Sequence, residues 1–353
     1  MSVSALYRND LGLNDIRKAC GRYAEFYFQL VIKLKALWRY PLSAKKRKRY
    51  LISRTGGPLV MEHGGEAAIV VPFDFSSTLS VDRVAVIFHC FYVDLVDEFM
   101  QYFKNIPCDA DFFISTDSAE KAEEIKLRFF GQFKGSIDIR IVPNRGRDVA
   151  PKFVTFADVY ERYNIFVHLH TKQSARAGAK LAGWRGYFLE TLLGSPKIII
   201  SILTLLQDPK IGIVFPATYK PIRPYMSWGR NAAKIRPILA RFGLTLSLGN
   251  NRIEFPSGSM FWGRSNAIKP ILDLGLTFDD FDLEAGQVDG TLAHAIERVI
   301  LYSCEVANLE WRKISKPYLA VPGDTLIRIT SLASIKEARE KVFIPVIPQV
   351  PGD

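Results

Sequence analysis

Short apolar segments alternate with helix-length segments between residues 83 and 169, and this alternation constrains the fold more than any other feature of the chain. Repeated strand and helix units of this length predict a mostly parallel α/β sheet with helices on both faces. The predicted strands are 83–89, 111–115, 137–142 and 165–169, and the helices between them are 94–105, 118–130 and 150–163.

The second half of the chain is less regular. Its elements are read from helical spacing and from short apolar runs. The predicted helices cover 184–193, 195–207 and 231–242, a strand covers 211–215, and an acidic run at 279–290 opens a further helix that ends near Tyr302. We therefore expect the region of alternating strands and helices to be followed by a less regular second half of the same α/β domain.

Positive charge is concentrated at the amino terminus. The net charge is +11, but residues 1–54 hold 13 Lys and Arg against 3 Asp and Glu, so the rest of the chain is almost neutral. A protein that binds nucleic acid in a groove across its folded domain would carry basic residues throughout that domain. The distribution of charge therefore disfavours nucleic acid as a partner.

The same basic region has the pattern of a segment that contacts membranes. Apolar residues recur at helical spacing between 14 and 50, and the run KKRKR occupies 45–49. This combination is typical of binding to an anionic membrane surface, although a helix packed on the body, followed by a solvated charge run, would look the same. The sequence shows no signal peptide and no uncharged apolar run of bilayer length, so we expect a cytoplasmic protein that is soluble or peripheral.

Missing motifs exclude several common chemistries. The strand predicted at 83–89 is not followed by GxGxxG, and GxxxxGK[ST] appears nowhere, so neither a dinucleotide dehydrogenase nor a P-loop enzyme is indicated. The four cysteines include no CxxC pair, which disfavours a zinc knuckle or a disulfide framework and favours a reducing compartment.

Charged residues gather where two of the predicted strands end. A glycine turn after the third strand holds charged and polar residues, and the fourth strand leads into HLHTK at 168–172. The carboxyl ends of parallel strands meet at one edge of a sheet, where α/β proteins bind ligands. We therefore predict an anionic ligand, such as a nucleotide diphosphate, at this edge. The predicted ligand-binding residues are Asp117, Asn144, Arg145, Gly146, Arg147, Asp148, His170 and Lys172.

These residues also have plainer interpretations. The turn could be a solvated loop of salt bridges, and Asp117 or Ser118 could cap the next helix. His168 and His170 point to one face of their strand, which suits metal ligands, hydrogen-bonded scaffold or direct contact with phosphate. The sequence leaves open whether Mg²⁺ or Mn²⁺ takes part.

Two carboxylates of the acidic run are candidates for a general base. Glu284 and Asp289 precede the helix that contains His294 and Arg298, which share a helical face. Asp289 could instead be the helix N-cap. The segment FPSGSMFW at 255–262 offers small residues for close backbone approach and aromatic ones for stacking on a sugar or for the core. The residues that we assign to acceptor binding are Trp184, Ser257, Gly258, Ser259, Trp262, His294 and Arg298.

Four motifs together resemble a known family. NRGRDVAPKF, HLHTKQS, FPSGSMFWGR and EAGQVDGTLAHAIER, in this order, look like the rhamnan synthesis protein F family, over about Val81 to Tyr302. The resemblance implies a GT-A-like, Rossmann-type glycosyltransferase that extends rhamnose-containing glycans in bacterial cell walls or O-antigens. It also implies a nucleotide-sugar donor, with dTDP-rhamnose as the candidate, and a lipid-linked saccharide acceptor at the inner face of the membrane.

The resemblance suggests a division of the chain. We expect a basic helical segment at 1–56, a glycosyltransferase domain at 81–305 and a tail at 306–353. Within the domain, 81–172 would bind the nucleotide and 173–305 the acceptor. Where the wider GT-A group has an Asp-x-Asp metal motif, this chain has HLHTK, so either a metal is held differently or Lys172 and the arginines replace it.

The expected function is therefore an inverting glycosyl transfer. The donor diphosphate would lie between the turn at 144–148 and the end of the fourth strand, and Asp289 or Glu284 would activate an acceptor hydroxyl. One alternative is a metal-dependent hydrolase built on His168, His170, Asp148 and His294. The other is a non-catalytic, membrane-associated assembly factor.

Overall fold

The computed structural model describes residues 65–77, 81–171, 183–245, 248 and 252–347. The chain divides into two compact units, Met1–Pro58 and Leu59–Asp353. All the described residues belong to the second unit. The basic helical segment predicted at 1–56, the run KKRKR and Lys172 lie outside the described residues.

The described residues form a single sheet of nine strands in the order β4-β3-β2-β5-β7-β6-β8-β1-β9. Neighbouring strands run parallel, except that β7 is antiparallel to both β5 and β6. The strands are β1 (Ala67–Val70), β2 (Arg83–His89), β3 (Asp109–Thr116), β4 (Ile137–Ile141), β5 (Ile165–His170), β6 (Ile211–Pro216), β7 (Phe261–Arg264), β8 (Glu310–Ser315) and β9 (Thr325–Ile327).

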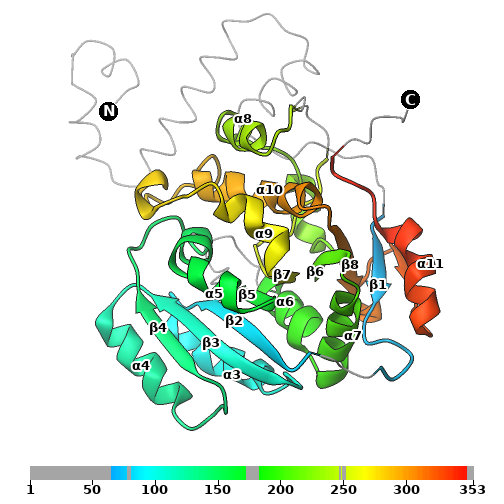
Figure 1. The fold of residues 1–353 in the computed structure, drawn as a ribbon, viewed down its shortest axis with the longest axis horizontal. Coiled ribbons are helices and arrows are strands. Elements are labelled where there is room, and N and C mark those ends of the chain that lie inside the picture. The colour runs from blue at the N-terminus through cyan, green and yellow to red at the C-terminus, as the bar shows by residue number, and fades with distance from the viewer. Residues whose placement is uncertain (1–64, 78–80, 172–182, 246–247, 249–251, 348–353) are drawn as a thin grey trace, which may run out of the picture. The chain divides into compact units, whose positions relative to one another are not determined.

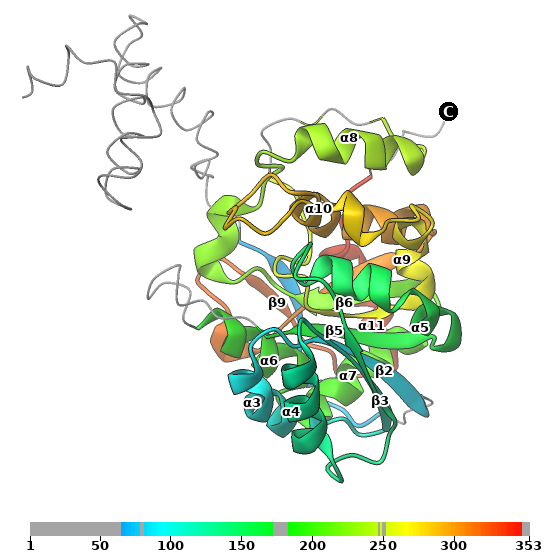
Figure 2. The same ribbon diagram turned by 90° about the vertical axis from the view of Figure 1, so that its left-hand side faces the viewer.

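Helices cover both faces of the sheet. One face packs on α3, α4, α6, α7 and α11, and the other on α5, α8, α9 and α10. Figures 1 and 2 show these two layers, with α8, α9 and α10 together on one side. The helices are α3 (Val96–Phe103), α4 (Ala119–Phe129), α5 (Ala157–Arg162), α6 (Trp184–Leu193), α7 (Pro196–Gln207), α8 (Ala232–Arg241), α9 (Ser265–Leu272), α10 (Leu292–Val306) and α11 (Leu332–Val342).

The central strands are apolar on both sides because both sides are covered. In β2, Val84, Val86 and Phe88 enter one core, whereas Ala85 and Ile87 enter the other. A strand buried on both faces reads as a continuous apolar run. The predicted fold class, a mostly parallel α/β sheet flanked by helices, is confirmed, and its GT-A-like character stays a prediction.

Several elements differ from the predicted ones. The helix expected at 150–163 is a π-helical turn, Pro151–Thr155, followed by the short helix α5. Strand β1 precedes the strand taken as the first, and FWGR, read as part of an aromatic segment, is β7. Beyond residue 306, β8, β9 and α11 join the same sheet and its helical layer. These strands have three to six residues, too few for a clear period.

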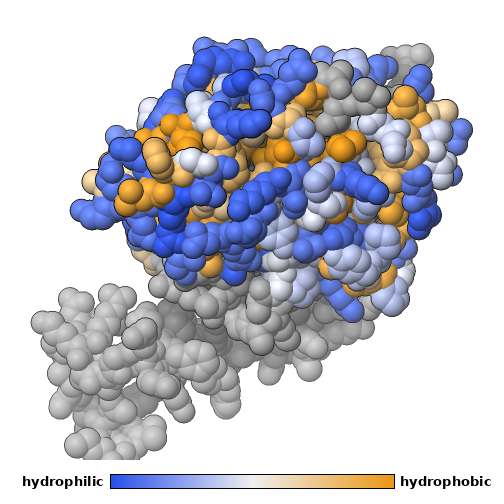
Figure 3. Space-filling view, turned by 90° about the horizontal axis from the view of Figure 1, so that it is seen from below, coloured by the Kyte–Doolittle hydropathy of each residue, from blue (hydrophilic) through white to orange (hydrophobic). Residues whose placement is uncertain are grey.

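One face of the described part of the molecule is largely polar. Figure 3 views the molecule from below Figure 1 and shows a mostly hydrophilic face with smaller hydrophobic patches. Within the described ranges, exposed apolar side chains include Leu127 and Phe130 at α4, and Leu283 and Val288 in the acidic segment. In the same ranges no single helix has the length and apolarity to cross a membrane, and only the pair α6 and α7, bent by 69°, meets that test jointly.

Candidate functional site

The turn at 144–148 depends on glycine. Gly146 has φ 71°, and a Cβ added to it would lie 2.4 Å from Ala150 Cβ and 2.7 Å from the Phe281 ring. Such contacts are too short for any side chain, so the turn fits only glycine at this position. The turn can therefore pack directly against the acidic segment.

Arg145 fastens this turn to the acidic segment. Its Nε donates to the Phe281 carbonyl at 2.6 Å, and its Nη1 lies 2.8 Å from Asp279 Oδ1. Arg145 and Leu283 also form an isolated antiparallel bridge. The guanidinium predicted to bind a ligand is thus engaged within the protein, while Asn144 is exposed beside it.

Arg147 brings Glu284 to the turn. The backbone N–H of Arg147 donates to Glu284 Oε1 at 3.1 Å, and the two side chains approach to 3.9 Å. The Arg147 guanidinium also donates to the Gln287 carbonyl. Arg147 has φ 57°, a conformation that few side chains adopt. A candidate base and a candidate ligand-binding turn are therefore in contact.

Lys152, which the sequence did not single out, joins three of the motifs. Its Nζ donates to Asp148 Oδ2 at 2.9 Å and to the Ser259 carbonyl at 2.7 Å, and it lies 3.3 Å from His170 Nδ1. His170 Nδ1 is also 3.3 Å from Asp148 Oδ2. The predicted meeting of the turn with the end of β5 is thus mediated by a buried ammonium. Its spacing of four residues from Asp148 was the available signal.

Two further histidines at this edge of the sheet, His168 and His89, are neutral and are hydrogen-bonded within the protein. His168 Nε2 lies 2.5 Å from Tyr160 Oη, and burial holds the His168 pKa well below its ordinary value. His89 Nδ1 is 3.0 Å from Ser115 Oγ, and burial lowers its pKa to about 4. Throughout the described part of the chain, no three His, Cys, Asp or Glu side chains are arranged to hold a metal ion. The set His168, His170, Asp148 and His294 is accordingly not a metal cluster here.

Asp289 is tightly bound within the protein. Its carboxylate accepts from the Arg230 N–H at 2.9 Å and Asn231 Nδ2 at 2.7 Å, and lies 3.3 Å from Arg298 Nη2. Burial alone would raise the Asp289 pKa, but Arg298 and these hydrogen bonds outweigh it, so the pKa lies below its ordinary value. Thr291, and not Asp289, caps α10.

His294 lies at the start of α10 as a neutral ring. Its Nδ1 is 2.6 Å from Thr291 Oγ1 and 3.4 Å from the Thr291 N–H in a capping box. Burial, followed by the charges of Arg147 and Arg298, lowers its pKa to about 4. Arg298 donates to the Ser227 carbonyl at 2.8 Å and is itself buried.

Asp117 pairs with a lysine and does not cap a helix. Asp117 Oδ1 is 2.5 Å from Lys121 Nζ, which also donates to the Phe91 carbonyl at 2.9 Å. The N-cap of α4 is Ser118, whose Oγ accepts from the Lys121 N–H at 3.3 Å. Asp117 keeps a partly exposed side chain at the carboxyl end of β3.

The segment 255–264 divides between the site and the core. Trp262 is fully buried, and its Nε1 donates to the Leu192 carbonyl at 3.1 Å, so it cannot touch an acceptor in this conformation. The Gly258 N–H donates to Glu297 Oε1 at 2.5 Å, and Ser257 is buried beside it. A Cβ at Gly258 would lie 2.7 Å from Phe188 and 3.3 Å from Trp184, which lies next to Tyr219.

Of the predicted site residues, the structure thus brings together Arg147, Asp148, His170, Ser259 and Glu284.

Comparison with known proteins decides the family. The sequence profile described as Rhamnan synthesis protein F matches residues 67–308. The chain belongs to the rhamnan synthesis protein F family.

The relatives of this family member are longer proteins. Two proteins, each described as "Uncharacterized protein WxcX" and found in two strains of Xanthomonas campestris pv. campestris, are 32% identical over 231 residues. The match covers 64% of this chain and 32% of the relatives, so the chain spans about a third of their length. A solved structure of CMP:2-keto-3-deoxy-manno-octonic acid synthetase complexed with CTP is also similar, at 10% identity. Its TM-score is 0.37, and the match covers 74% of this chain and 98% of that one.

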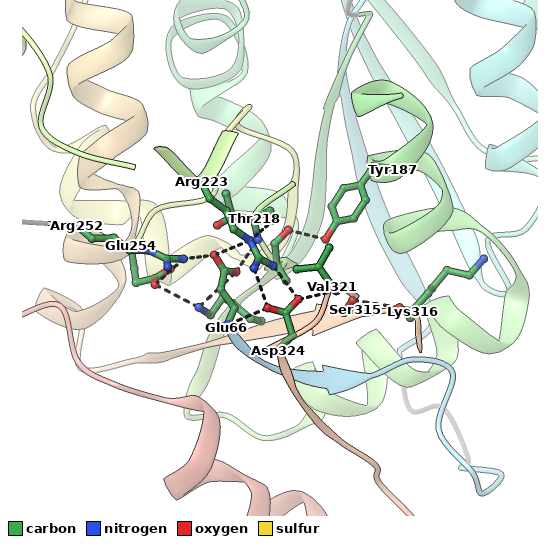
Figure 4. Close-up of polar contacts among 12 residues, drawn as sticks. Glu66, Tyr187, Thr218, Arg223, Arg252, Glu254, Ser315, Lys316, Val321 and Asp324 are labelled. Atoms are coloured by element: carbon green, nitrogen blue, oxygen red, sulfur yellow. Dashed lines mark hydrogen bonds and ion pairs between the residues drawn. The ribbon is translucent and has the colours of Figure 1, made fainter. Parts of the chain in front are cut away.

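A second polar cluster ties the family region to the residues beyond it. The buried Glu66 carboxylate accepts from the Thr218 N–H at 2.7 Å and meets Arg223, Arg252 and Lys313. Figure 4 shows Arg223 continuing to Asp324, with both of its terminal nitrogens 2.8 Å from that carboxylate. The cluster therefore joins β1, the loops after β6 and before β7, and the carboxyl-terminal strands.

Proposed function

We propose that this member of the rhamnan synthesis protein F family is a glycosyltransferase. It transfers a sugar, with rhamnose from dTDP-rhamnose as the first candidate, to a lipid-linked saccharide and inverts the anomeric centre. The donor diphosphate lies between the turn at 144–148 and the end of β5, with the nucleoside toward Asp117. The nucleotide half is 81–172 and the acceptor half is 173–305.

The contact between Arg147 and Glu284 is the observation that supports this proposal most directly. It puts a carboxylate from the acidic segment at the carboxyl edge of the sheet, 3.1 Å from the backbone of the turn. Inverting transfer requires a base on the face of the anomeric carbon opposite to the leaving diphosphate, because the acceptor oxygen attacks that carbon from behind the bond that breaks. The base and the diphosphate site must therefore lie on the two sides of one sugar ring. The turn and Glu284 supply these two parts together.

Between the two candidate bases, the surroundings favour Glu284. A base needs a free lone pair and a pKa close to the working pH. Asp289 has a lowered pKa, and both of its oxygens accept hydrogen bonds at 2.9 Å or less. Glu284 accepts one backbone N–H, and its side chain is 26% exposed. We therefore assign Glu284 as the base and Asp289 as the residue that fixes the loop before α10.

Nucleotide sugars provide the first test. A ligand that binds only the folded state stabilises it by about 2.7 kcal/mol at a concentration of 100 Kd. We expect dTDP-rhamnose to raise the melting temperature by about 2–6 °C, and sugars that share its nucleotide to have smaller effects. A panel of nucleotide sugars read by thermal shift measures this. If none of them stabilises the protein and none supports transfer, the glycosyltransferase assignment fails.

Membrane contact through the basic segment is a separate expectation. Each basic residue near an anionic surface contributes about 1 kcal/mol. Replacing Lys45 and Lys46 by glutamine in the full chain should weaken binding to vesicles that contain phosphatidylserine by roughly 30-fold. Sedimentation with vesicles measures the change, and Lys126→Gln with Lys269→Gln, both in exposed positions of the body, is the matched control. Equal sedimentation of both double variants would refute the membrane role.

A further inference from the structure

The ammonium of Lys152 is the most deeply buried charge at this edge of the sheet. Its side chain is 1% exposed, and it lies on the π-helical turn Pro151–Thr155. Its Nζ is in contact with Asp148 Oδ2, the Ser259 carbonyl and His170 Nδ1. A charge so far from water is stable only where charged or polar partners compensate it. Three motifs that are far apart in sequence therefore meet at one cation.

The partners of Lys152 have the composition of a metal site. A carboxylate oxygen, a backbone carbonyl and an imidazole nitrogen are the groups that divalent cations take as ligands. Here they lie 2.7–3.3 Å from an ammonium, which is hydrogen-bond geometry and longer than coordination distances. A cation attached to the chain thus occupies the position that a metal would need.

The ammonium also bears on the protonation of His170. Lys152 can only donate, so its 3.3 Å contact is favourable when His170 Nδ1 carries a lone pair. Asp148 Oδ2, also 3.3 Å from Nδ1, would favour a proton there, but this oxygen already accepts from the ammonium at 2.9 Å. The ring proton then lies on Nε2, at the other side of the ring. A histidine that ligates a metal through Nε2 must carry its proton on Nδ1, where it would face the ammonium. His168 offers no substitute, because its Nε2 contacts Tyr160 Oη and the whole side chain is buried among the Phe153, Phe166 and Phe261 rings.

We propose that Lys152 is a positioning residue that replaces a metal ion at the end of β5 and fixes His170 as an Nε2–H donor for the donor diphosphate. The assignment of the diphosphate rests on the proposed function. The residues present do not fit Mg²⁺ or Mn²⁺ at this place. His170 is then a neutral hydrogen-bond donor, and the buried ammonium adds positive potential behind it.

The tautomer of His170 gives a direct test. In the full chain labelled with ¹⁵N-histidine, the five imidazoles are few enough to assign, and His170→Gln identifies the signal. We expect protonated Nε2 and bare Nδ1 in the native protein. In Lys152→Met the proton should move to Nδ1, toward Asp148. Lys269→Met removes an exposed lysine that is 2.7 Å from an aspartate four residues away, and should leave the spectrum unchanged.

Two further measurements complete the test. Mn²⁺ should leave the His170 signal of the native protein sharp, and the affinity for dTDP should fall roughly tenfold in Lys152→Met. A protonated Nδ1 in the native protein, or broadening of the His170 signal by Mn²⁺, would overturn the proposal even if the variant does not fold. Absence of dTDP binding with the expected tautomer would count against the proposed function and the diphosphate role, while the positioning of His170 by Lys152 would stand.

Discussion

Replacing Glu284 by glutamine should lower the rate of sugar transfer by about 10²–10⁴-fold, the usual contribution of a general base. Glutamine keeps an oxygen that can accept the Arg147 N–H, so the turn at 144–148 should keep its conformation. It cannot take a proton from an acceptor hydroxyl. Donor affinity should therefore change little, because the diphosphate contacts lie on the turn and on β5.

The measurement separates catalysis from binding. Initial rates at saturating donor and acceptor give the loss of turnover, and calorimetry with dTDP gives donor affinity. Glu123→Gln, on an exposed face of α4, is the control for loss of one carboxylate. Full activity of Glu284→Gln would exclude Glu284 as the base. Loss of dTDP binding in the same variant would mean that Glu284 acts in binding.

Asp289→Asn distinguishes the two carboxylates. Its oxygens accept from the Arg230 N–H and Asn231 Nδ2, so an amide nitrogen would replace an acceptor at one of these contacts. We expect a smaller loss of rate than in Glu284→Gln, accompanied by lower stability. If Asp289→Asn alone abolishes transfer at unchanged stability, the two roles are reversed.

The sequence predicts the elements whose pattern is local. Strand β2 is recognisable because Val84 to Phe88 fill two cores in turn, so every position is apolar. The turn at 144–148 is recognisable because Gly146 and two arginines interrupt the strand and helix alternation. The meeting of the turn with the end of β5 follows from the parallel topology, which places strand ends together.

Side-chain partners at long range are invisible to such reasoning. From the sequence, Trp262 is assigned to acceptor binding as a ring that could stack on a sugar. In the structure it lies on β7, and its indole is buried in the core, where Nε1 donates to the Leu192 carbonyl. Lys152 falls in the helix predicted at 150–163, and nothing local indicates that Ser259 and His170 come to it from 107 and 18 residues away. The same holds for Glu66, whose partners come from the loops after β6 and before β7 and from β8.

Glu66→Gln should destabilise the protein by about 3–5 kcal/mol, the cost of removing one partner from a buried set of charges. The Glu66 side chain is 1% exposed and faces Arg223, Arg252 and Lys313. Glutamine can still accept the Thr218 N–H, but it leaves Asp324 and Glu254 to balance one buried and two partly buried cations (Figure 4). The three side chains are only 7–20% exposed, so solvent screens the excess positive charge poorly and the folded state loses stability.

Urea denaturation measures the effect as a shift in the midpoint at constant slope. Asp74→Asn is a matched control, because Asp74 also binds a guanidinium with both oxygens, each 2.9 Å from Arg328, but its side chain is 34% exposed. An exposed pair of this kind is worth less than about 1 kcal/mol. Equal effects of the two variants would show that burial adds nothing to the Glu66 cluster. A large effect of Glu66→Gln alone would show that the strands after residue 308 are held to the family region by charge as well as by the sheet.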